Sequence, residues 1–487
     1  MDKTKYEKFI KYLVDNGIQL SKSVEIRPSG LGGVGVFALT DLPADTVLLQ
    51  VPKTEVLSPS TCGIANLLER AGLDGMIGLT VAYIFEKCQG KASPWFEYLE
   101  TIEKTDHLPR FWSDQEKARF TGTEIDYMGG LDANEISTVF ETTVLPFIKE
   151  NITCFPGGEK YMALGDYIKA TEQVCSRAFE VDVFRGLSLV PGACLFNHAG
   201  EESVHFESRA EVCDVCGEEY CDHIAHDEIE AARKNMEEFF ETDDDEQETE
   251  MNEKSTLSMD QMQSDNESQH SNSVGDEEDD DEGPPDTCDI VTVKPISKGE
   301  EIFNTYGYYS NGVLLARYGF AIWDNPHETV AVSRELVSLA KSSNLYNRVK
   351  WWSKHYQQYL FGSDENEDEA EDNEFLSWQE TLEILSSGEL SPGLEKLLTV
   401  LSLSPNKFLA TQVKAKKGNF SLPTTDVAKT ALVLINKRST RYQDGNMSST
   451  DYKKVLDTTD DVRTRLTVIV RGTEKLVLER AKLLLKR

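Results

Sequence analysis

The chain has 487 residues, 39% of them hydrophobic, which is enough for two or three domains with sizeable cores. Its formal net charge of −35 would repel phosphate, and no basic face stands out, which argues against nucleic acid as a direct partner. No apolar run is long enough to span a bilayer, and the first residues are not typical of a signal peptide or a myristoylation site. We therefore expect a soluble intracellular protein, cytoplasmic and with the nucleus as a second location.

The first 150 residues predict a β unit followed by helices. An amphipathic helix is expected over 5–16, and the alternation over 23–27 predicts a strand. Between 35 and 56, β-branched and aromatic residues with few breaks favour short strands and turns. The spacing of apolar residues becomes helical from about 62 to 150.

Two later segments with strand character lie on either side of a long acidic stretch. They span 203–207 and 289–293, and we expect them to pair as a hairpin that carries the residues between them as an insertion. Such an insertion is tolerated because the entropy of loop closure grows only logarithmically with length. Residues 227–287 hold 24 acidic and 3 basic side chains, and 364–374 hold 8 acidic ones and no basic one. Both runs have too few large apolar residues for a core, and their composition predicts disorder.

After residue 330 the pattern is helical again. We expect helices within 331–361, 375–402, 424–437 and 458–486. Their apolar faces predict an all-helical C-terminal domain packed on the β-rich part.

A series of short motifs resembles the SET-domain lysine methyltransferases, and in particular the Rubisco large-subunit methyltransferase group with its fungal relatives that act on ribosomal proteins and elongation factors. Each motif alone is weak, but all of them follow the order of that family between about residues 20 and 330. They are the glycine segment 30–37, the segment 93–99, the segment 108–112, Ser176-Arg177, Asn197-His198, Lys298-Gly299-Glu300-Glu301-Ile302, Asn304-Thr305-Tyr306-Gly307 and Arg317-Tyr318-Gly319-Phe320.

The resemblance implies an α+β fold with a β-rich SET core, a helical insert and a helical C-terminal domain. The expected divisions are an N-terminal helix at 1–20, the SET N-terminal part at 21–61, the helical insert at 62–175, the SET core with a cysteine cluster at 176–226, the acidic insertion at 227–287, the SET C-terminal part at 288–330, and a helical substrate-binding domain at 331–487 with an acidic loop at 362–374.

The glycine segment has two further interpretations. Gly30-x-Gly32-x-x-Gly35 has the letters of a dinucleotide-binding motif, but that motif needs a helix after it, and Pro43 follows a strand-like run here. A plain glycine turn between strands is the other alternative. The resemblance instead implies that Gly32, Gly33, Val34 and Gly35 lie against S-adenosylmethionine, where little Cβ bulk is tolerated.

The resemblance also assigns the remaining residues of a methyl-transfer site. Tyr306 matches the catalytic tyrosine, which also borders the cofactor. Tyr318 and Phe320 match the walls of the lysine channel, and the Asn197-His198 pair matches residues that hold the two ends of the cofactor. The tyrosines have an ordinary alternative as core residues. Tyrosine suits the chemistry because it offers a flat apolar wall and one hydroxyl that orients an amine.

Arg177 and Cys194 are expected to lie near the cofactor. Arg177 matches a basic residue whose guanidinium would bind the methionine carboxylate of the cofactor in a bidentate manner, although it is also compatible with a surface arginine. Cys194 stands where many relatives have an acid, three residues before Asn197. That change removes one polar contact near the cofactor, so we expect a lower affinity or a replacement contact.

Cysteines cluster at the start of the insertion. The spacing of Cys213, Cys216, Cys221 and His223 is compatible with a tetrahedral metal site, and Cys288 returns where the hairpin should close. The sequence therefore predicts a structural zinc held by these residues. Reduced free cysteines and a redox pair remain the alternatives.

We expect an S-adenosylmethionine-dependent protein-lysine N-methyltransferase, monomeric, whose substrate is a basic protein such as a ribosomal protein or an elongation factor. Two other functions stay open. One is a histone-lysine methyltransferase, and the other is a non-catalytic SET scaffold that binds partners through its acidic insertion.

Overall fold

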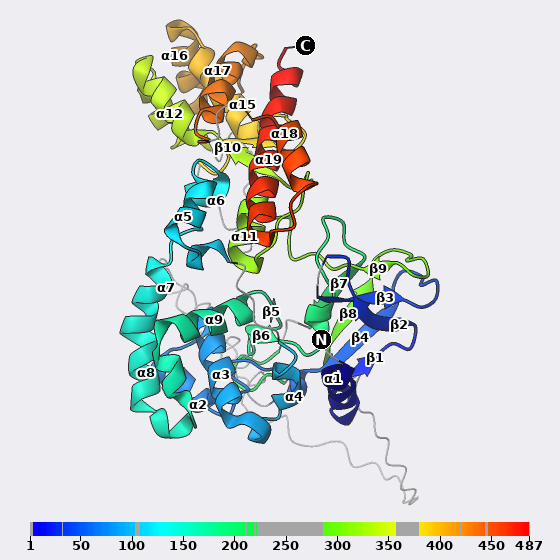
Figure 1. Cartoon of the computed structure of the whole chain (residues 1–487). Coiled ribbons are helices and arrows are strands. Elements are labelled where there is room, and N and C mark those ends of the chain that lie inside the picture. The colour runs from blue at the N-terminus through cyan, green and yellow to red at the C-terminus, as the bar shows by residue number, and fades with distance from the viewer. Residues whose placement is uncertain are drawn as a thin grey trace, which may run out of the picture.

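The protein is described here from a computed structural model that covers residues 3–31, 33–102, 108–209, 212–218, 221, 286–356, 379–417, 421–443 and 447–486. Three bodies of structure are visible in Figure 1. Small β-sheets lie beside a group of helices from the insert, and the C-terminal helices form a further layer on the side of α5, α6 and α11. Both acidic runs fall almost entirely outside the described residues, so their predicted disorder stays a prediction.

The β-rich part consists of short antiparallel strands. They are β1 (Gln19–Leu20), β2 (Val24–Pro28), β3 (Val34–Ala38), β4 (Val47–Pro52), β5 (Ala178–Glu180), β6 (Leu187–Leu189), β7 (Val204–Ser208), β8 (Thr287–Thr292) and β9 (Glu301–Ile302). Four of them form a sheet in the order β1-β4-β8-β7, three form a sheet in the order β2-β3-β9, and β5 pairs with β6. Strands from both ends of the SET region are therefore neighbours in each of the two larger sheets.

The hairpin predicted around the insertion is confirmed. Strands β7 and β8 are antiparallel partners, with Val204 opposite Thr292 and Ser208 opposite Cys288. The other edge of β8 pairs with β4. The insertion thus connects the end of β7 to the start of β8, and both strands are held in a four-stranded sheet.

The helices of the insert complete the core of the sheets. The N-terminal helix is α1 (Lys3–Asp15), and the insert contains α2 (Ala65–Ala71), α3 (Gly75–Gln89), α4 (Phe96–Leu99), α5 (Asp114–Lys117), α6 (Glu124–Tyr127), α7 (Asn134–Val139), α8 (Leu145–Glu150) and α9 (Leu164–Cys175). One cluster of buried residues includes Val36 of β3, Leu49 of β4, Tyr83 of α3 and Val174 of α9. Sheets and insert helices therefore share a single core.

The C-terminal region is mainly helical. Its elements are α11 (Asn311–Tyr318), β10 (Thr329–Ala331), α12 (Ser333–Ser342), α13 (Tyr346–Trp352), β11 (Glu383–Leu385), α15 (Pro392–Ser402), α16 (Pro405–Ala415), α17 (Ala428–Ser439), α18 (Ser449–Leu456) and α19 (Val462–Leu484). The expectation of an all-helical domain is wrong in one detail, because β10 and β11 pair as a two-stranded ribbon. Among the described helices, none is both long enough and apolar enough to cross a membrane.

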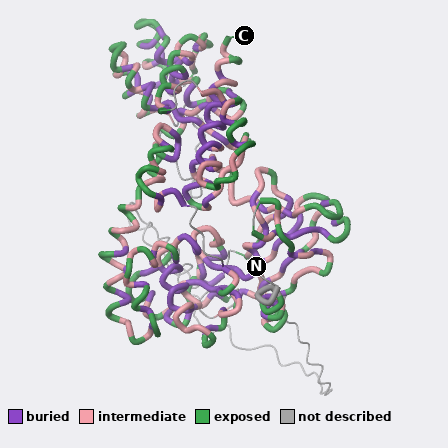
Figure 2. The backbone as a smooth tube through the Cα atoms, in the orientation of Figure 1, coloured by how far each residue is buried: buried purple, intermediate pink, exposed green. Residues whose placement is uncertain are grey.

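The C-terminal helices have a core of their own, which includes Leu336, Leu397, Leu434 and Leu478. A smaller buried cluster joins this region to the insert and to α11, and it contains Trp112, Phe120, Ile125, Leu315, Ala316, Leu466 and Val470. Figure 2 shows buried backbone in each body and along the α11–α19 contact. Helix α11 is thereby fixed from two sides.

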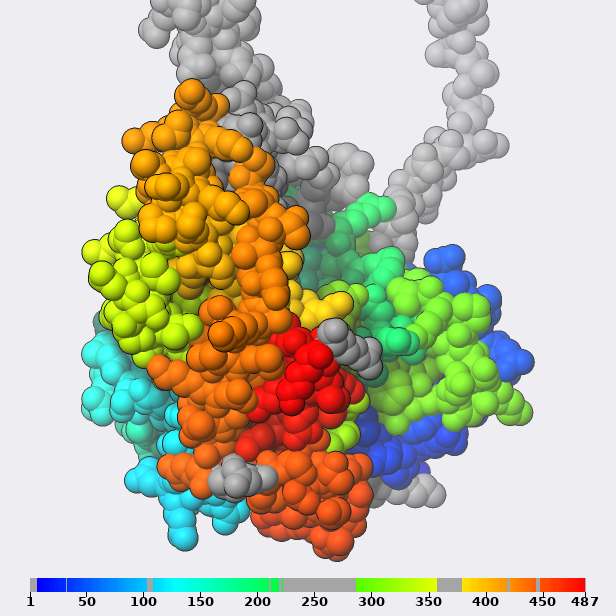
Figure 3. Space-filling model, turned by 90° about the horizontal axis from the view of Figure 1, so that it is seen from above, coloured from blue at the N-terminus to red at the C-terminus, as the bar shows by residue number. Residues whose placement is uncertain are grey.

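A buried arginine strengthens the same junction. The guanidinium of Arg438 is fully buried and lies 2.7 Å from a carboxylate oxygen of Glu124 and 3.2 Å from one of Glu474. It also donates to the carbonyl oxygens of Gly122 and Ala331. Figure 3 shows the insert segment at the edge of the face that the C-terminal helices form. One guanidinium faces two buried carboxylates, and burial raises the pKa of Glu124 and raises that of Glu474 to about 7. These contacts join the insert to α17 and α19.

Candidate active site

Two segments about one hundred residues apart meet in the SET core. The amide of Asn304 donates to the carbonyl oxygen of Asn197 at 2.9 Å, and the amide of Ala199 donates to that of Asn304 at 3.1 Å. This short parallel pairing places Asn197-His198 beside Thr305-Tyr306. The two most informative motifs of the sequence therefore form one structural unit.

His198 is held as a neutral hydrogen-bond acceptor. Its side chain is buried, and its Nδ1 accepts the backbone amide of Tyr306 at 2.9 Å. Burial, with a smaller contribution from His327, lowers the pKa of His198 from 6.5 to about 4. At neutral pH the imidazole is therefore uncharged, with its Nδ1 lone pair engaged by the loop that carries Tyr306.

The Tyr306 ring lies in an aromatic cage built from three segments. Its centroid is 4.9 Å from that of Tyr318, 5.2 Å from that of His198 and 6.1 Å from that of Phe320. Helix α11 ends at Tyr318, and Gly319 follows in the left-handed region at φ 78°, which returns Phe320 to the same cage. The predicted channel residues are thus neighbours of Tyr306.

The hydroxyl of Tyr306 donates to the carbonyl oxygen of Phe196 at 3.3 Å. Burial raises the pKa of Tyr306 well above its ordinary value of 10. The phenol is therefore protonated at physiological pH. Because its one proton is given to Phe196, its oxygen lone pairs face the rest of the cage.

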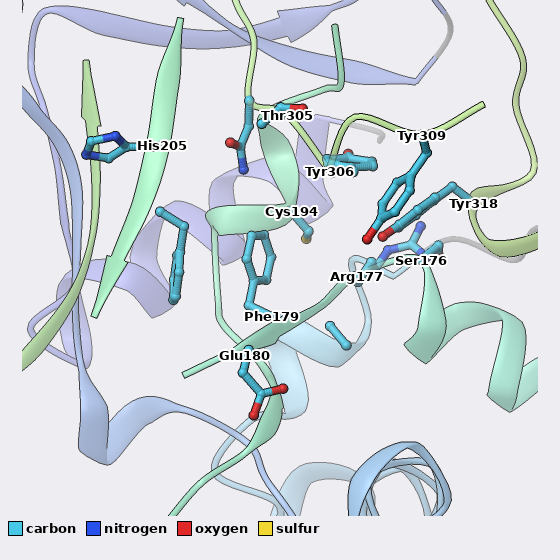
Figure 4. Close-up of a pocket in the computed structure, with 13 residues that line it drawn as sticks. Ser176, Arg177, Phe179, Glu180, Cys194, His205, Thr305, Tyr306, Tyr309 and Tyr318 are labelled. Carbon is cyan, nitrogen blue, oxygen red and sulfur yellow. The ribbon is translucent and has the colours of Figure 1, made fainter. Parts of the chain in front are cut away.

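A cavity of about 440 Å³ adjoins this cage (Figure 4). Its lining residues are Ser176, Arg177, Ala178, Phe179, Glu180, Cys194, His205, Phe206, Asn304, Thr305, Tyr306, Tyr309 and Tyr318. In Figure 4 the side chains of Tyr309 and Tyr318 lie side by side with their hydroxyl ends toward Arg177, while His205 lies apart on its strand. One cation, several hydroxyls and aromatic walls therefore surround the same space.

Arg177 is positioned by the end of α9. Its guanidinium donates to the carbonyl oxygen of Gln173 at 3.1 Å and to the hydroxyl of Ser176 at 2.8 Å. Cys194 lies in the same cavity, and burial raises the pKa of its thiol, an effect that the charge of Arg177 partly offsets. The thiol is therefore neutral at this position.

The glycine segment contacts Asn197 from the other side. Asn197 Nδ2 donates to the carbonyl oxygen of Val34 at 3.0 Å and to Glu301 Oε1 at 2.8 Å. A Cβ atom at Gly35 would lie 2.2 Å from that Glu301 oxygen and 2.9 Å from Asn197 Nδ2, so a larger residue would require both side chains to move. Gly33 has φ 67°, and Gly32 lies outside the described residues. Strand β3 is thus held directly against the Asn197 side chain.

Comparison with known proteins identifies the chain. Residues 33–307 match the SET domain family. The chain is 33% identical over 458 residues to ribosomal lysine N-methyltransferase 3 of Saccharomyces cerevisiae, covering 82% of each protein. The chain belongs to the SET-domain family.

More distant relatives and solved structures of similar fold are also lysine methyltransferases or SET domains. N-lysine methyltransferase SETD6 of Mus musculus is 26% identical over 330 residues, which span 64% of this chain and 53% of that one. The crystal structure of the SET domain of LSMT bound to lysine and AdoHcy superposes with a TM-score of 0.58 at 17% identity, covering 99% of this chain and 91% of that one. The structure of Rubisco LSMT bound to AdoMet gives a TM-score of 0.55. The α+β SET fold with a helical C-terminal region, as predicted, is confirmed.

Sequence reasoning missed several residues of the SET cavity, among them Phe179, Glu180, Phe206 and Tyr309. Tyr309 lines it, although no motif singled it out. Gly307 has φ 120°, and a Cβ atom there would lie 2.4 Å from the Tyr309 ring. The chain therefore folds back so that Tyr309 faces the same cavity as Tyr306. The signal available in the sequence is the glycine directly after Tyr306, which permits this reversal.

A second cavity, of about 570 Å³, adjoins the first along Ala178, Tyr309 and Tyr318. It lies between the insert and α11, and its walls include Met76, Ile77, Leu108, Ile136, Val139, Arg110 and Arg317. Tyr318 thus separates a compartment with mixed polarity from one that is mainly apolar.

The predicted metal ligands are only partly brought together. The sulfurs of Cys213, Cys216 and Cys221 lie within 4.8 Å of one another. Cys288 is not among them, because its side chain points from β8 into the core, where its sulfur lies 3.9 Å from the Ser208 hydroxyl. His223 lies outside the described residues. The inclusion of Cys288 in the predicted cluster is therefore wrong.

Proposed function

We propose that this SET protein transfers a methyl group from S-adenosylmethionine to a lysine of a ribosomal protein. The observation that carries the proposal is the 33% identity with a ribosomal lysine N-methyltransferase over 82% of both chains. The neighbouring enzyme structures contain AdoMet or AdoHcy with lysine or methyllysine, and their fold is shared.

The residues around the first cavity fit this cofactor. Arg177 lines the cavity and offers a guanidinium to a carboxylate, and the Asn197-His198 segment pairs with Asn304, which lines it too. Strand β3 packs closely on Asn197, because the absence of a Cβ atom at Gly35 lets the Asn197 and Glu301 side chains approach it. When bound, S-adenosylmethionine supplies a methyl group activated by a sulfonium charge.

The aromatic cage prepares the lysine. A lysine with a pKa of about 10.4 is mostly protonated at neutral pH and must lose its proton before its nitrogen is a nucleophile. Placement in the first cavity against Tyr306 and Tyr318 removes the ammonium from water, which favours the neutral amine. The proton would leave to solvent, and the neutral amine held against Tyr306 and Tyr318 would accept the methyl group that a bound S-adenosylmethionine supplies.

Tyr306 positions the reacting nitrogen. Its hydroxyl proton is directed to the Phe196 carbonyl, so its oxygen lone pairs face the cage and orient the amine in line with the methyl group. The neutral His198 fixes the backbone of Tyr306 without adding a positive charge that would oppose the sulfonium. Tyr306 is therefore assigned as the catalytic residue.

The second cavity suits the chain segment that carries the lysine. Its apolar walls continue from Tyr318, and Arg317 and Arg110 stand at its lining. A lysine stem passing Tyr318 would leave its backbone in this cavity. The acidic composition of the chain would attract a basic partner at long range, with strong salt dependence. We further propose that the protein is a monomer without direct nucleic-acid contacts. It would be located in the cytoplasm and in part in the nucleus, and it would act in translation.

One experiment tests the proposal. The purified protein is incubated with labelled S-adenosylmethionine and ribosomal proteins from cells that lack it, with histones and elongation factors as parallel substrates. Label on a ribosomal protein, lost in the Tyr306→Phe variant, supports the proposal. Label confined to histones would favour the histone alternative. Cofactor binding without any transfer would favour a non-catalytic scaffold.

A further inference from the structure

Three cysteines form a cluster outside the methyl-transfer site. Cys213, Cys216 and Cys221 follow β7 at the start of the insertion, and their sulfurs lie within 4.8 Å of one another. Cys213 is buried, and the other two are half-buried. None of the nine cysteines of the chain is in a disulfide. A disulfide would join two of the three sulfurs and leave the third without a role, whereas a metal uses all three.

The backbone around Cys213 is shaped to hold a sulfur ligand. The amide nitrogen of Val215 points at the Cys213 sulfur from 3.4 Å. The amide of Gly217 donates to the Cys213 carbonyl at 2.8 Å, and the amide of Cys213 donates to the Glu218 carbonyl at 2.9 Å. Gly217 adopts φ 76° and closes the turn. An amide directed at sulfur stabilises a thiolate, which is the form that binds metal.

The turn is also fixed against the SET core. A Cβ atom at Gly217 would lie 2.4 Å from the Phe184 ring, so the turn packs directly on that side chain. The Gly217 carbonyl accepts from Arg185 Nη1 at 3.4 Å, and the same guanidinium nitrogen lies 2.8 Å from Asp182. The cysteine turn and the loop before β6 therefore form one packed unit.

A buried lysine connects this unit to both ends of the insertion. The Lys53 ammonium, 1% exposed, lies 3.1 Å from Asp182 and 2.9 Å from Asp286. It also donates to the Arg209 carbonyl at 2.8 Å. Arg209 follows β7 and Asp286 precedes β8, so one ammonium joins the start of the insertion, its end and the loop on which the cysteine turn packs.

We propose that Cys213, Cys216 and Cys221 bind one structural Zn²⁺ that fixes the start of the insertion on the SET core. Three thiolates select a soft or borderline cation, and zinc accepts them in a tetrahedral arrangement. The metal draws the segment after β7 toward Phe184 and Arg185. Its contribution is to stability at the hairpin root. The methyl-transfer residues, which lie on other segments, keep their geometry without it.

Metal analysis of the full chain purified without chelator is the primary test. We expect about one zinc per chain in the wild type and almost none in Cys213→Ser or Cys216→Ser. Cys288→Ala is the matched control, because that cysteine lies at the same hairpin root but outside the cluster. It should keep its zinc. A metal-free wild type with all three cysteines open to alkylation would overturn the proposal, as would loss of zinc in Cys288→Ala alone.

Thermal unfolding supplies a second, independent measurement. A strong chelator should lower the melting temperature of the wild type to that of Cys213→Ser and should leave the variant unchanged. An equal chelator effect on both proteins contradicts the assignment. Substitution by Co²⁺ then counts the ligands, because thiolate-to-cobalt absorption grows with the number of thiolates. Three are expected, and a spectrum of four would return Cys288 to the site.

Discussion

The backbone amide of Tyr306 donates to Nδ1 of His198, and this contact joins residues 108 positions apart. It makes the orientation of Tyr306 depend on the protonation state of a histidine. A protonated Nδ1 would be a donor and could not accept that amide. The neutral state of His198 is therefore part of the site's construction.

Tyr306→Phe should reduce methyl transfer by about 100-fold, the scale seen when one donor or acceptor is lost at a reacting centre. The ring and its contacts with Tyr318 remain, so the affinity for S-adenosylhomocysteine should change little. Single-turnover rates at saturating cofactor, together with calorimetric titration, separate the two effects. Wild-type turnover in this variant would remove Tyr306 from its assigned role.

Arg177→Ala and Asn197→Ala should weaken cofactor binding by about 1–3 kcal/mol each. Asn197 also holds Val34 and Glu301 together, so this variant should lose some thermal stability, whereas Arg177 bonds only neighbouring residues of α9 and Ser176. Calorimetry with S-adenosylhomocysteine and thermal unfolding are measured on both variants. Unchanged affinity in both would place the cofactor elsewhere.

Stability should depend on pH through His198. Its pKa in the folded state, about 4, is below the ordinary 6.5, so the unfolded chain binds the proton first as pH falls. The contribution of His198 to the free energy of unfolding is fully present above about pH 6.5, and it is lost as the pH falls from about 6.5 to about 4. His198→Asn places a non-titrating acceptor near the position of Nδ1. Urea unfolding across this range should show a smaller pH slope in the variant, and equal slopes would exclude His198 as the cause.

Arg438→Met should destabilise the protein by about 3–5 kcal/mol, because Glu124 and Glu474 would lose their buried cation. Lys453→Met, which removes an exposed cation paired with Asp457, is the control and should cost less than about 1 kcal/mol. Denaturant unfolding measures both. Similar decreases in the free energy of unfolding of the two variants would mean that the buried ion cluster stabilises the protein no more than an exposed ion pair does.

Deleting about 235–283 should preserve folding and basal methyl transfer. Its composition offers few apolar side chains for packing, and the hairpin from which the insertion leaves is held by β4. The association rate with a basic substrate should fall at low salt, because many acidic groups are removed. A melting temperature lowered by many degrees would show that the tract belongs to the folded core.

The order of motifs in the sequence was sufficient to predict the SET fold and the meeting of Asn197-His198 with Tyr306. The hairpin of β7 and β8 also followed from the sequence, because two alternating segments bracket a stretch that cannot pack. Helices α3 and α19 correspond to segments with clear helical spacing. Clear periodicity of apolar residues, or a local composition that cannot form a core, is therefore sufficient to predict these elements.

Other features depend on tertiary geometry that spacing does not contain. Strand β11 was expected to be helical, but Glu383–Leu385 pairs with Thr329–Ala331 across a large sequence distance. Cys288 was grouped with the other cysteines because the hairpin closes near them. Its position on β8 turns its side chain inward, opposite Ser208 and Val51. A shift of one residue along the strand would have reversed that direction.

The buried ammonium of Lys53 holds both ends of the insertion, at Arg209 and at Asp286. Because the chain enters at Arg209 and returns at Asp286 on the same ammonium, the length of the intervening segment is uncoupled from the geometry of the methyl-transfer residues. A change in the length of that segment would therefore leave the residues around Tyr306 in place. The same place would accept an internal fluorescent domain or affinity tag, leaving the packed helix at the carboxyl end undisturbed.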